Sequence, residues 1–138
     1  TLPQCDSHHR GMLNAATEAC KIVAPQAVND LDLLARIDEA LRHGKSEVKI
    51  SGRMVPFGEG VSAAHKVIDE ALRHMAISIG SAASVDRVLL AGGGAPLLNV
   101  RLPHVLPHLT DVAVMVKEPF YSNVRGFLYF SLAMHEAE

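Results

Sequence analysis

The sequence has little cysteine, no excess of either charge and no long hydrophobic run. Its two cysteines, Cys5 and Cys20, are too few for a disulfide scaffold and form no C-x-x-C pair. The 13 basic and 15 acidic residues give a formal net charge of -2, which argues against a surface built to neutralise nucleic-acid phosphates. No apolar run approaches the roughly 20 residues that a membrane span needs. We therefore expect a cytoplasmic protein that binds neither a membrane nor nucleic acid directly.

The composition is that of a globular protein, with 49% hydrophobic and 20% charged residues, and it predicts about one domain. In the first half of the chain, apolar residues recur every three or four positions, which predicts helices over residues 11–23, 31–41 and 61–79. Asp30 or Asn29 is the expected N-terminal cap of the second helix, and Gly44 is its expected stop. The alternating residues of 47–57 predict a small β-hairpin.

Two apolar runs in the second half predict parallel strands. Residues 86–91 (DRVLLA) and 111–116 (DVAVMV) are apolar on both faces, as the buried strands of a parallel sheet are. A helix that begins near Ala95 or Pro96 separates them, and a helix over 122–138 follows. This order predicts an α/β fold with parallel strands flanked by helices. Two strands leave sheet edges uncovered, so we expect the fold to need further strands from elsewhere.

A triple glycine, Gly92, Gly93 and Gly94, stands between the first of these strands and its helix. Glycines bring backbone N–H groups, unobstructed by any Cβ, beside the positive end of the helix dipole, where a nucleotide can bind. A plain tight turn is the simpler alternative. The dinucleotide fingerprint G-x-G-x-x-G is broken because Leu97 stands at the position of its last glycine, which argues against a Rossmann-type site.

The motif VLLAGGGA at 88–95 resembles the adenosine motif of the actin, sugar kinase and DnaK-type chaperone superfamily. Six residues separate Pro119 from Gly126, a spacing similar to that superfamily's second connecting motif. The segment EPFYSNVRGF at 118–127 resembles the P-x-F-A-N-V-R-G-F signature of plasmid-encoded bacterial actins, of the ParM/StbA type and of the related protein D of the PRTRC system. Tyr121 and Ser122 depart from that signature, in which phenylalanine and alanine are common.

This resemblance implies that residues 1–138 are the C-terminal part of an actin-like ATPase and belong to its ribonuclease H-like second domain. Residues 29–57 would form a small helix-plus-hairpin insertion, a peripheral subdomain. The full-length protein would bind ATP with Mg²⁺, form filaments with copies of itself and engage a plasmid partition adaptor. The family's phosphate-binding and catalytic loops have no match in this chain, so we assign no catalytic residue and no metal ligand.

The resemblance also implies roles for single residues. Gly126 would let the last helix pack tightly at the interdomain hinge. Leu97 and Leu98 are interpreted as helix-packing residues, with contact to the base as the alternative. Lys45, Lys49 and Arg53 are interpreted as a solvated basic edge, with contact to the nucleotide as the alternative. The backbone of four residues would lie beside the adenine and ribose: Gly92, Gly93, Gly94 and Ala95.

Two other interpretations of the chain stay open. One is a stand-alone α/β interaction or oligomerisation module, in which the glycines serve only the turn. A small nucleotide-dependent enzyme with a Rossmann-like turn is the third. Asn123 and Arg125 have several interpretations as well: they order the loop, they bind a neighbouring group, or they are a helix cap and an exposed charge.

Overall fold

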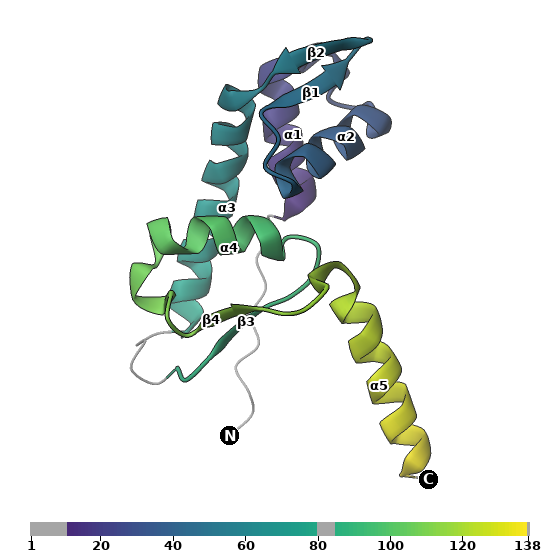
Figure 1. Ribbon diagram of the computed structural model, residues 1–138, viewed down its shortest axis with the longest axis vertical. Helices are drawn as coiled ribbons and strands as arrows, with labels where there is room; N and C mark the ends of the chain where they lie inside the picture. The colour runs from purple at the N-terminus through teal and green to yellow at the C-terminus, as the bar shows by residue number, and fades with distance from the viewer. Residues whose placement is uncertain (1–10, 80–84, 138) are drawn as a thin grey trace.

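The computed structural model describes residues 11–79 and 85–137 of the chain as a mixed α/β structure in which helices predominate (Figure 1). The predicted helices and the predicted hairpin are confirmed, and Cys5 lies outside the described residues. The helices are α1 (Met12–Val23), α2 (Leu31–Arg42), α3 (Gly58–Ile79), α4 (Ala95–Val105) and α5 (Ser122–Glu136). The strands are β1 (Glu47–Ile50), β2 (Arg53–Pro56), β3 (Val88–Leu90) and β4 (Ala113–Met115), and the short 3-10 turns are η1 (Pro25–Ala27), η3 (Pro107–Leu109) and η4 (Pro119–Tyr121).

The centre of the core is the contact between α1 and α3. Small side chains on α1 let the two helix backbones approach closely, and the α1 residues buried there are Ala15, Ala16, Ala19 and Cys20. Gly60 of α3 faces α1, and an added Cβ would stand 3.1 Å from the Ala19 carbonyl oxygen. A side chain at position 60 would therefore press on the backbone of α1.

The segment 29–57 adds α2 and the β1–β2 hairpin to the same core, through buried α2 side chains that include Leu34, Ile37 and Leu41. Its status as an inserted peripheral subdomain stays a prediction. Asp30 is the N-terminal cap of α2, since its carboxylate accepts hydrogen bonds from the N–H groups of Asp32 (3.0 Å) and Leu33 (3.1 Å).

The ends of α2 and the hairpin have the backbone conformations that their residues favour. Gly44 ends α2 with a φ of +62°, a left-handed conformation that glycine adopts without the steric penalty of a Cβ. In the hairpin, Ser51 (φ 49°) and Gly52 (φ 79°) both have positive φ, as a two-residue type I′ turn requires.

The parallel pair β3–β4 is smaller and more exposed than the sequence predicts. Val88 pairs with Ala113 and Leu90 with Met115, so each strand has three residues. Val88 and Leu90 are buried, but Leu89 is 61% exposed. The prediction of longer strands buried on both faces is wrong because α4 packs on one face of the pair, while Leu89, on the other, is left exposed.

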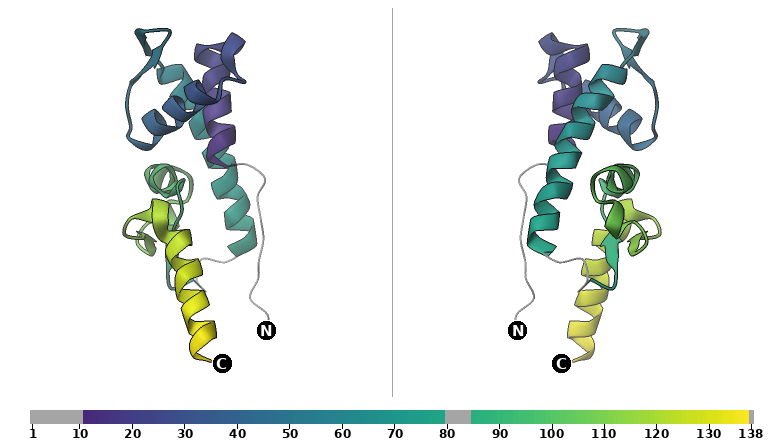
Figure 2. Two further views of the ribbon diagram at one scale, coloured as in Figure 1. Left: turned by 90° about the vertical axis from the view of Figure 1, so that its right-hand side faces the viewer. Right: turned by 90° about the vertical axis from the view of Figure 1, so that its left-hand side faces the viewer.

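Helix α5 extends away from the rest of the described chain (Figures 1 and 2). None of its residues is buried, and Phe127 is 76% exposed. The predicted helix is confirmed, but its apolar side chains have no burying partner within residues 11–79 and 85–137.

We predict that Gly60→Ala destabilises the protein even though alanine is the better helix former. Alanine gains up to about 1 kcal/mol of helix propensity over glycine, but its Cβ would press on the Ala19 carbonyl, which is rigid helix backbone. The control is Gly58→Ala in the same helix, where a Cβ meets nothing within 4 Å. Chemical denaturation should show a lower midpoint for Gly60→Ala and an equal or higher one for Gly58→Ala; equal shifts would contradict the close contact.

Candidate functional site

The candidate site is the glycine turn, residues 92–94, which connects β3 to α4. Gly92 has a φ of +82°, so a residue with a Cβ would be strained there. Its carbonyl accepts the N–H of Ala95 at 3.1 Å, which closes the turn, and Ala95 is fully buried. The three glycines are half-buried, so the turn keeps partial access to solvent.

Side chains from three helices meet at this turn. Arg42 of α2 donates a hydrogen bond from its Nη1 to the Gly93 carbonyl. Met12 of α1 lies against Gly94, where an added Cβ would stand 3.3 Å from its Cγ. Ser122, the first residue of α5, accepts a hydrogen bond from the Gly92 N–H at 3.0 Å. The turn is therefore the place where the beginnings or ends of α1, α2, α4 and α5 come together.

A cavity of about 250 Å³ lies at the N-terminus of α4, next to the turn along the chain, and its lining begins at Pro96, so it includes none of the four predicted residues Gly92, Gly93, Gly94 and Ala95. The first turn of α4 forms one wall, and the end of α2 and the beginning of α3 form the others. The lining residues are Ala40, Leu41, Arg42, Gly44, Lys45, Val61, His65, Pro96, Leu97 and Val100. Most of this lining is apolar, and the polar exceptions are cationic groups and one imidazole, an arrangement suited to a flat, mostly apolar ring with acceptor atoms.

The structure brings together part of what the sequence predicts. Leu97 is buried and lines the cavity. Its position is compatible with both predictions made for it, packing of the helix and contact with a base. Lys45 also lines the cavity, whereas Lys49 and Arg53 lie on the hairpin, away from it. No sequence signal marks Arg42 as a site residue, because its position at the end of α2 is unremarkable and its partners at the turn, Gly93 and Phe120, lie far along the chain.

An ion pair between α3 and α4 lies near His65, which lines the cavity. Arg101 of α4 donates from Nε and Nη2 to the two carboxylate oxygens of Asp69 on α3, at 2.8 and 2.9 Å. This hydrogen bonding lowers the pKa of Asp69, although burial opposes it, and it raises the pKa of Arg101. Burial, followed by the charge of Arg101, lowers the pKa of His65, so its imidazole is neutral at pH 7.

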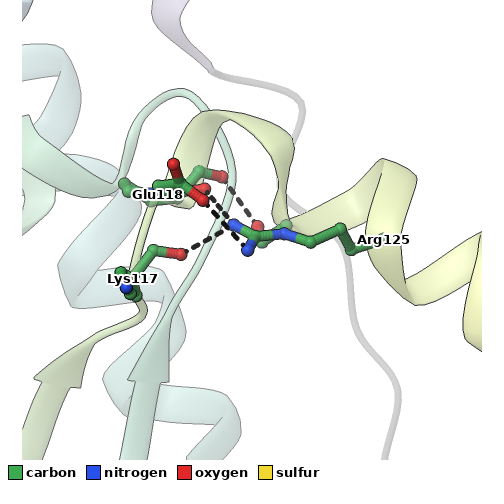
Figure 3. A network of polar contacts seen from close by, with 5 residues as sticks. Lys117, Glu118 and Arg125 are labelled. Atoms are coloured by element: carbon green, nitrogen blue, oxygen red, sulfur yellow. Dashed lines mark hydrogen bonds and ion pairs between the residues drawn. The ribbon is translucent and has the colours of Figure 1, made fainter.

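The loop before α5 is held by Arg125, as Figure 3 shows. Its Nη2 donates to the carbonyls of Lys117 (3.0 Å) and Glu118 (3.1 Å), and its Nη1 lies 3.1 Å from the Glu118 carboxylate. Glu118 has a left-handed backbone (φ 49°), which is unfavourable for a side chain with a Cβ. Arg125 thus orders this loop, one of its predicted roles.

Comparison of the chain with protein-family models, with curated proteins and with solved structures finds no match. In the described part of the chain, none of the helices has both the length and the apolar composition to cross a bilayer. The same part contains no group of three or more His, Cys, Asp or Glu side chains placed to hold a metal ion.

We predict that Asp69→Asn lowers the free energy of unfolding at pH 7 by about 1–3 kcal/mol, because Arg101 keeps a desolvated charge without its partner. Both side chains are mostly buried, Asp69 at 13% and Arg101 at 21% exposure. The folded-state pKa of Asp69 lies below its unfolded value, so its contribution is present above that unfolded value and is lost as the pH falls through the folded pKa.

Urea denaturation between pH 7 and pH 2 should therefore show the difference between wild type and Asp69→Asn shrinking in the acidic limb. His65→Gln is the control, because His65 affects stability over a different pH range. The pKa of His65 is lower in the folded state than in the unfolded state. Its contribution to stability therefore falls as the pH drops below the unfolded-state pKa of about 6.5. A difference that is independent of pH would contradict the role of the Asp69 carboxylate.

Proposed function

We propose that this chain is the C-terminal, nucleotide-binding portion of an actin-like ATPase and that the glycine turn binds the adenosine of ATP. The observation that carries the proposal is the cavity of about 250 Å³ beside the turn. Complete small-molecule sites usually measure about 300–1,000 Å³, so this cavity suits one ring system and not a whole nucleotide. An adenine base fits this description, with its ribose directed toward Gly92, Gly93 and Gly94.

The backbone at the turn supports this orientation. Among the described residues, the N–H groups of Gly93 and Gly94 have no hydrogen-bond acceptor, and both stand at the positive N-terminal end of α4. Such groups suit the oxygen atoms of a ribose or phosphate. The groups that would hold Mg²⁺ and the remaining phosphates are those of the family's phosphate hairpins, which this chain does not match, so we derive no hydrolytic step from these residues.

The finer fold belongs to the same proposal. In it, β3 and β4 are two strands of a ribonuclease H-like second domain, residues 29–57 are its inserted subdomain, and α5 is the connecting helix that packs at the domain hinge through Gly126. Two features support this arrangement: the parallel pair joined through α4, and an α5 whose apolar side chains lack a burying partner in the described chain. The EPFYSNVRGF segment alone supports the remaining parts of the proposal. These are membership of the plasmid-actin branch, filament formation and binding of a partition adaptor.

A second candidate function is an interaction or oligomerisation module, and the exposed face of α5 favours it. Its large exposed side chains are Val124, Phe127, Leu128, Tyr129, Phe130, Leu132 and Met134. Apolar patches of this kind mark surfaces that another chain or domain covers. Light scattering that shows a concentration-dependent oligomer, with no change in melting temperature on adding ATP, would favour this candidate over nucleotide binding.

We predict that ATP and adenosine raise the melting temperature of the chain in a concentration-dependent way, since a ligand at 100 times its Kd stabilises the folded state by about 2.7 kcal/mol. Gly93→Val should abolish this rise, because its side chain would stand where the Arg42 guanidinium now lies against Gly93 and would keep a ligand from the backbone of the turn. The helical core should stay folded, since the group displaced is the end of the Arg42 side chain and not backbone, although Arg42 would lose its bond to Gly93.

Gly58→Val is the matched control, at an exposed glycine where a Cβ meets nothing within 4 Å. It should bind ATP as the wild type does. Undiminished ATP binding by Gly93→Val would refute the assignment of the turn, and a thermal shift with NAD but not with ATP would replace it with the Rossmann-like alternative.

A further inference from the structure

Arg42 occupies a position that none of the predicted roles uses. It is the last residue of α2, and its side chain is 19% exposed. Its Nε donates to the Asp38 carboxylate at 2.7 Å, its Nη1 donates to the Gly93 carbonyl, and its guanidinium lies over the ring of Phe120, 5.5 Å from the ring centre. The same side chain forms part of the cavity wall.

These contacts depend on a single orientation of the guanidinium. The group is a rigid plane whose N–H donors point outward along its edge and whose face stacks on aromatic rings. The edge is directed to Asp38 and Gly93 while the central carbon, Cζ, lies over the Phe120 ring. A rotation that breaks one contact therefore weakens the others, so the side chain has one well-defined engaged state.

The engaged state holds the beginning of α5. Phe120 belongs to η4, directly before α5, and Ser122 bonds the glycine turn on the other side: its Oγ accepts the Gly92 N–H and donates to the Pro119 carbonyl at 2.7 Å. Arg42, the glycine turn and the root of α5 thus form a closed ring of contacts. Since no α5 residue is buried, this ring is a principal attachment of α5 to the rest of the described chain.

We infer that Arg42 is a positioning residue that couples occupancy of the cavity by a purine base to the attachment of α5. A base in the cavity contacts the Arg42 side chain from the side that faces the cavity. This contact restricts the side chain to the engaged state. Binding and attachment then stabilise one another, and the coupling acts equally in both directions because it is a difference in binding free energy. The inference rests on the proposed function for the identity of the ligand.

Phe120 provides the sharpest test because it does not line the cavity but makes a cation–π contact with Arg42. We expect Phe120→Leu to weaken adenosine binding, measured by calorimetry, by about fivefold or more, at the lower end of typical couplings between sites. Phe127→Leu is the matched control: the same change on α5, at a residue 76% exposed, should leave adenosine affinity unchanged.

Hydrogen exchange measures the coupling in the other direction. Adenosine should slow amide exchange at residues 122–126 in the wild type, and Arg42→Lys, which keeps the charge but loses the planar group, should remove that protection. Melting curves of each variant show that it is folded before binding is compared.

Each outcome decides a separate question. If adenosine binds but Phe120→Leu behaves like Phe127→Leu, or exchange at 122–126 does not respond, the role of Arg42 is overturned while the proposed site stands. If adenosine and ATP do not bind the wild-type chain at all, the proposed function falls and this inference with it.

Discussion

The close contact between α1 and α3 is the constraint on which the remaining structure depends. It exists because one helix presents alanines and a buried cysteine while the other presents Gly60, so that the backbones meet without intervening side chains. With these two helices fixed, α2 completes the core on one side, and Asp69 and Arg101 fix α4 against the far part of α3. The cavity is the space left between the end of α2, the beginning of α3 and the first turn of α4.

The glycine turn joins this helical body to the small parallel sheet and to α5. Its lack of a side chain at Gly93 allows Arg42 to reach the Gly93 carbonyl, because a Cβ there would stand against the guanidinium. The positive φ of Gly92 shapes the turn whose N–H donates to Ser122. The same property that lets a ligand come close also lets the protein's own side chains come close. Structural and ligand-binding uses of these glycines are therefore compatible, since the cavity lies beside the contacts that the turn already makes.

Much of the secondary structure could be predicted because its determinants are local. Asp30 accepts hydrogen bonds from the next turn of its own helix, Gly44 adopts a positive φ where α2 ends, and Ser51 and Gly52 form the two-residue turn between adjacent strands. The extent of the strands could not be predicted in the same way. The run around Leu89 is apolar on both faces, but whether a face is covered depends on what packs against it, and here α4 covers one face only.

The sequence by itself determined where the helices and the hairpin lie, where the glycine turn falls between strand and helix, and which family the motifs of residues 88–95 and 118–127 resemble. Only the tertiary structure decided that Arg42, Phe120 and Ser122 meet at that turn. Arg42 and Gly93 are 51 positions apart, and no periodicity or cap encodes such a contact. It arises because the packing of α2 against α1, and of α4 against α3, brings the end of one helix to the beginning of another, and that packing is a property of the whole core.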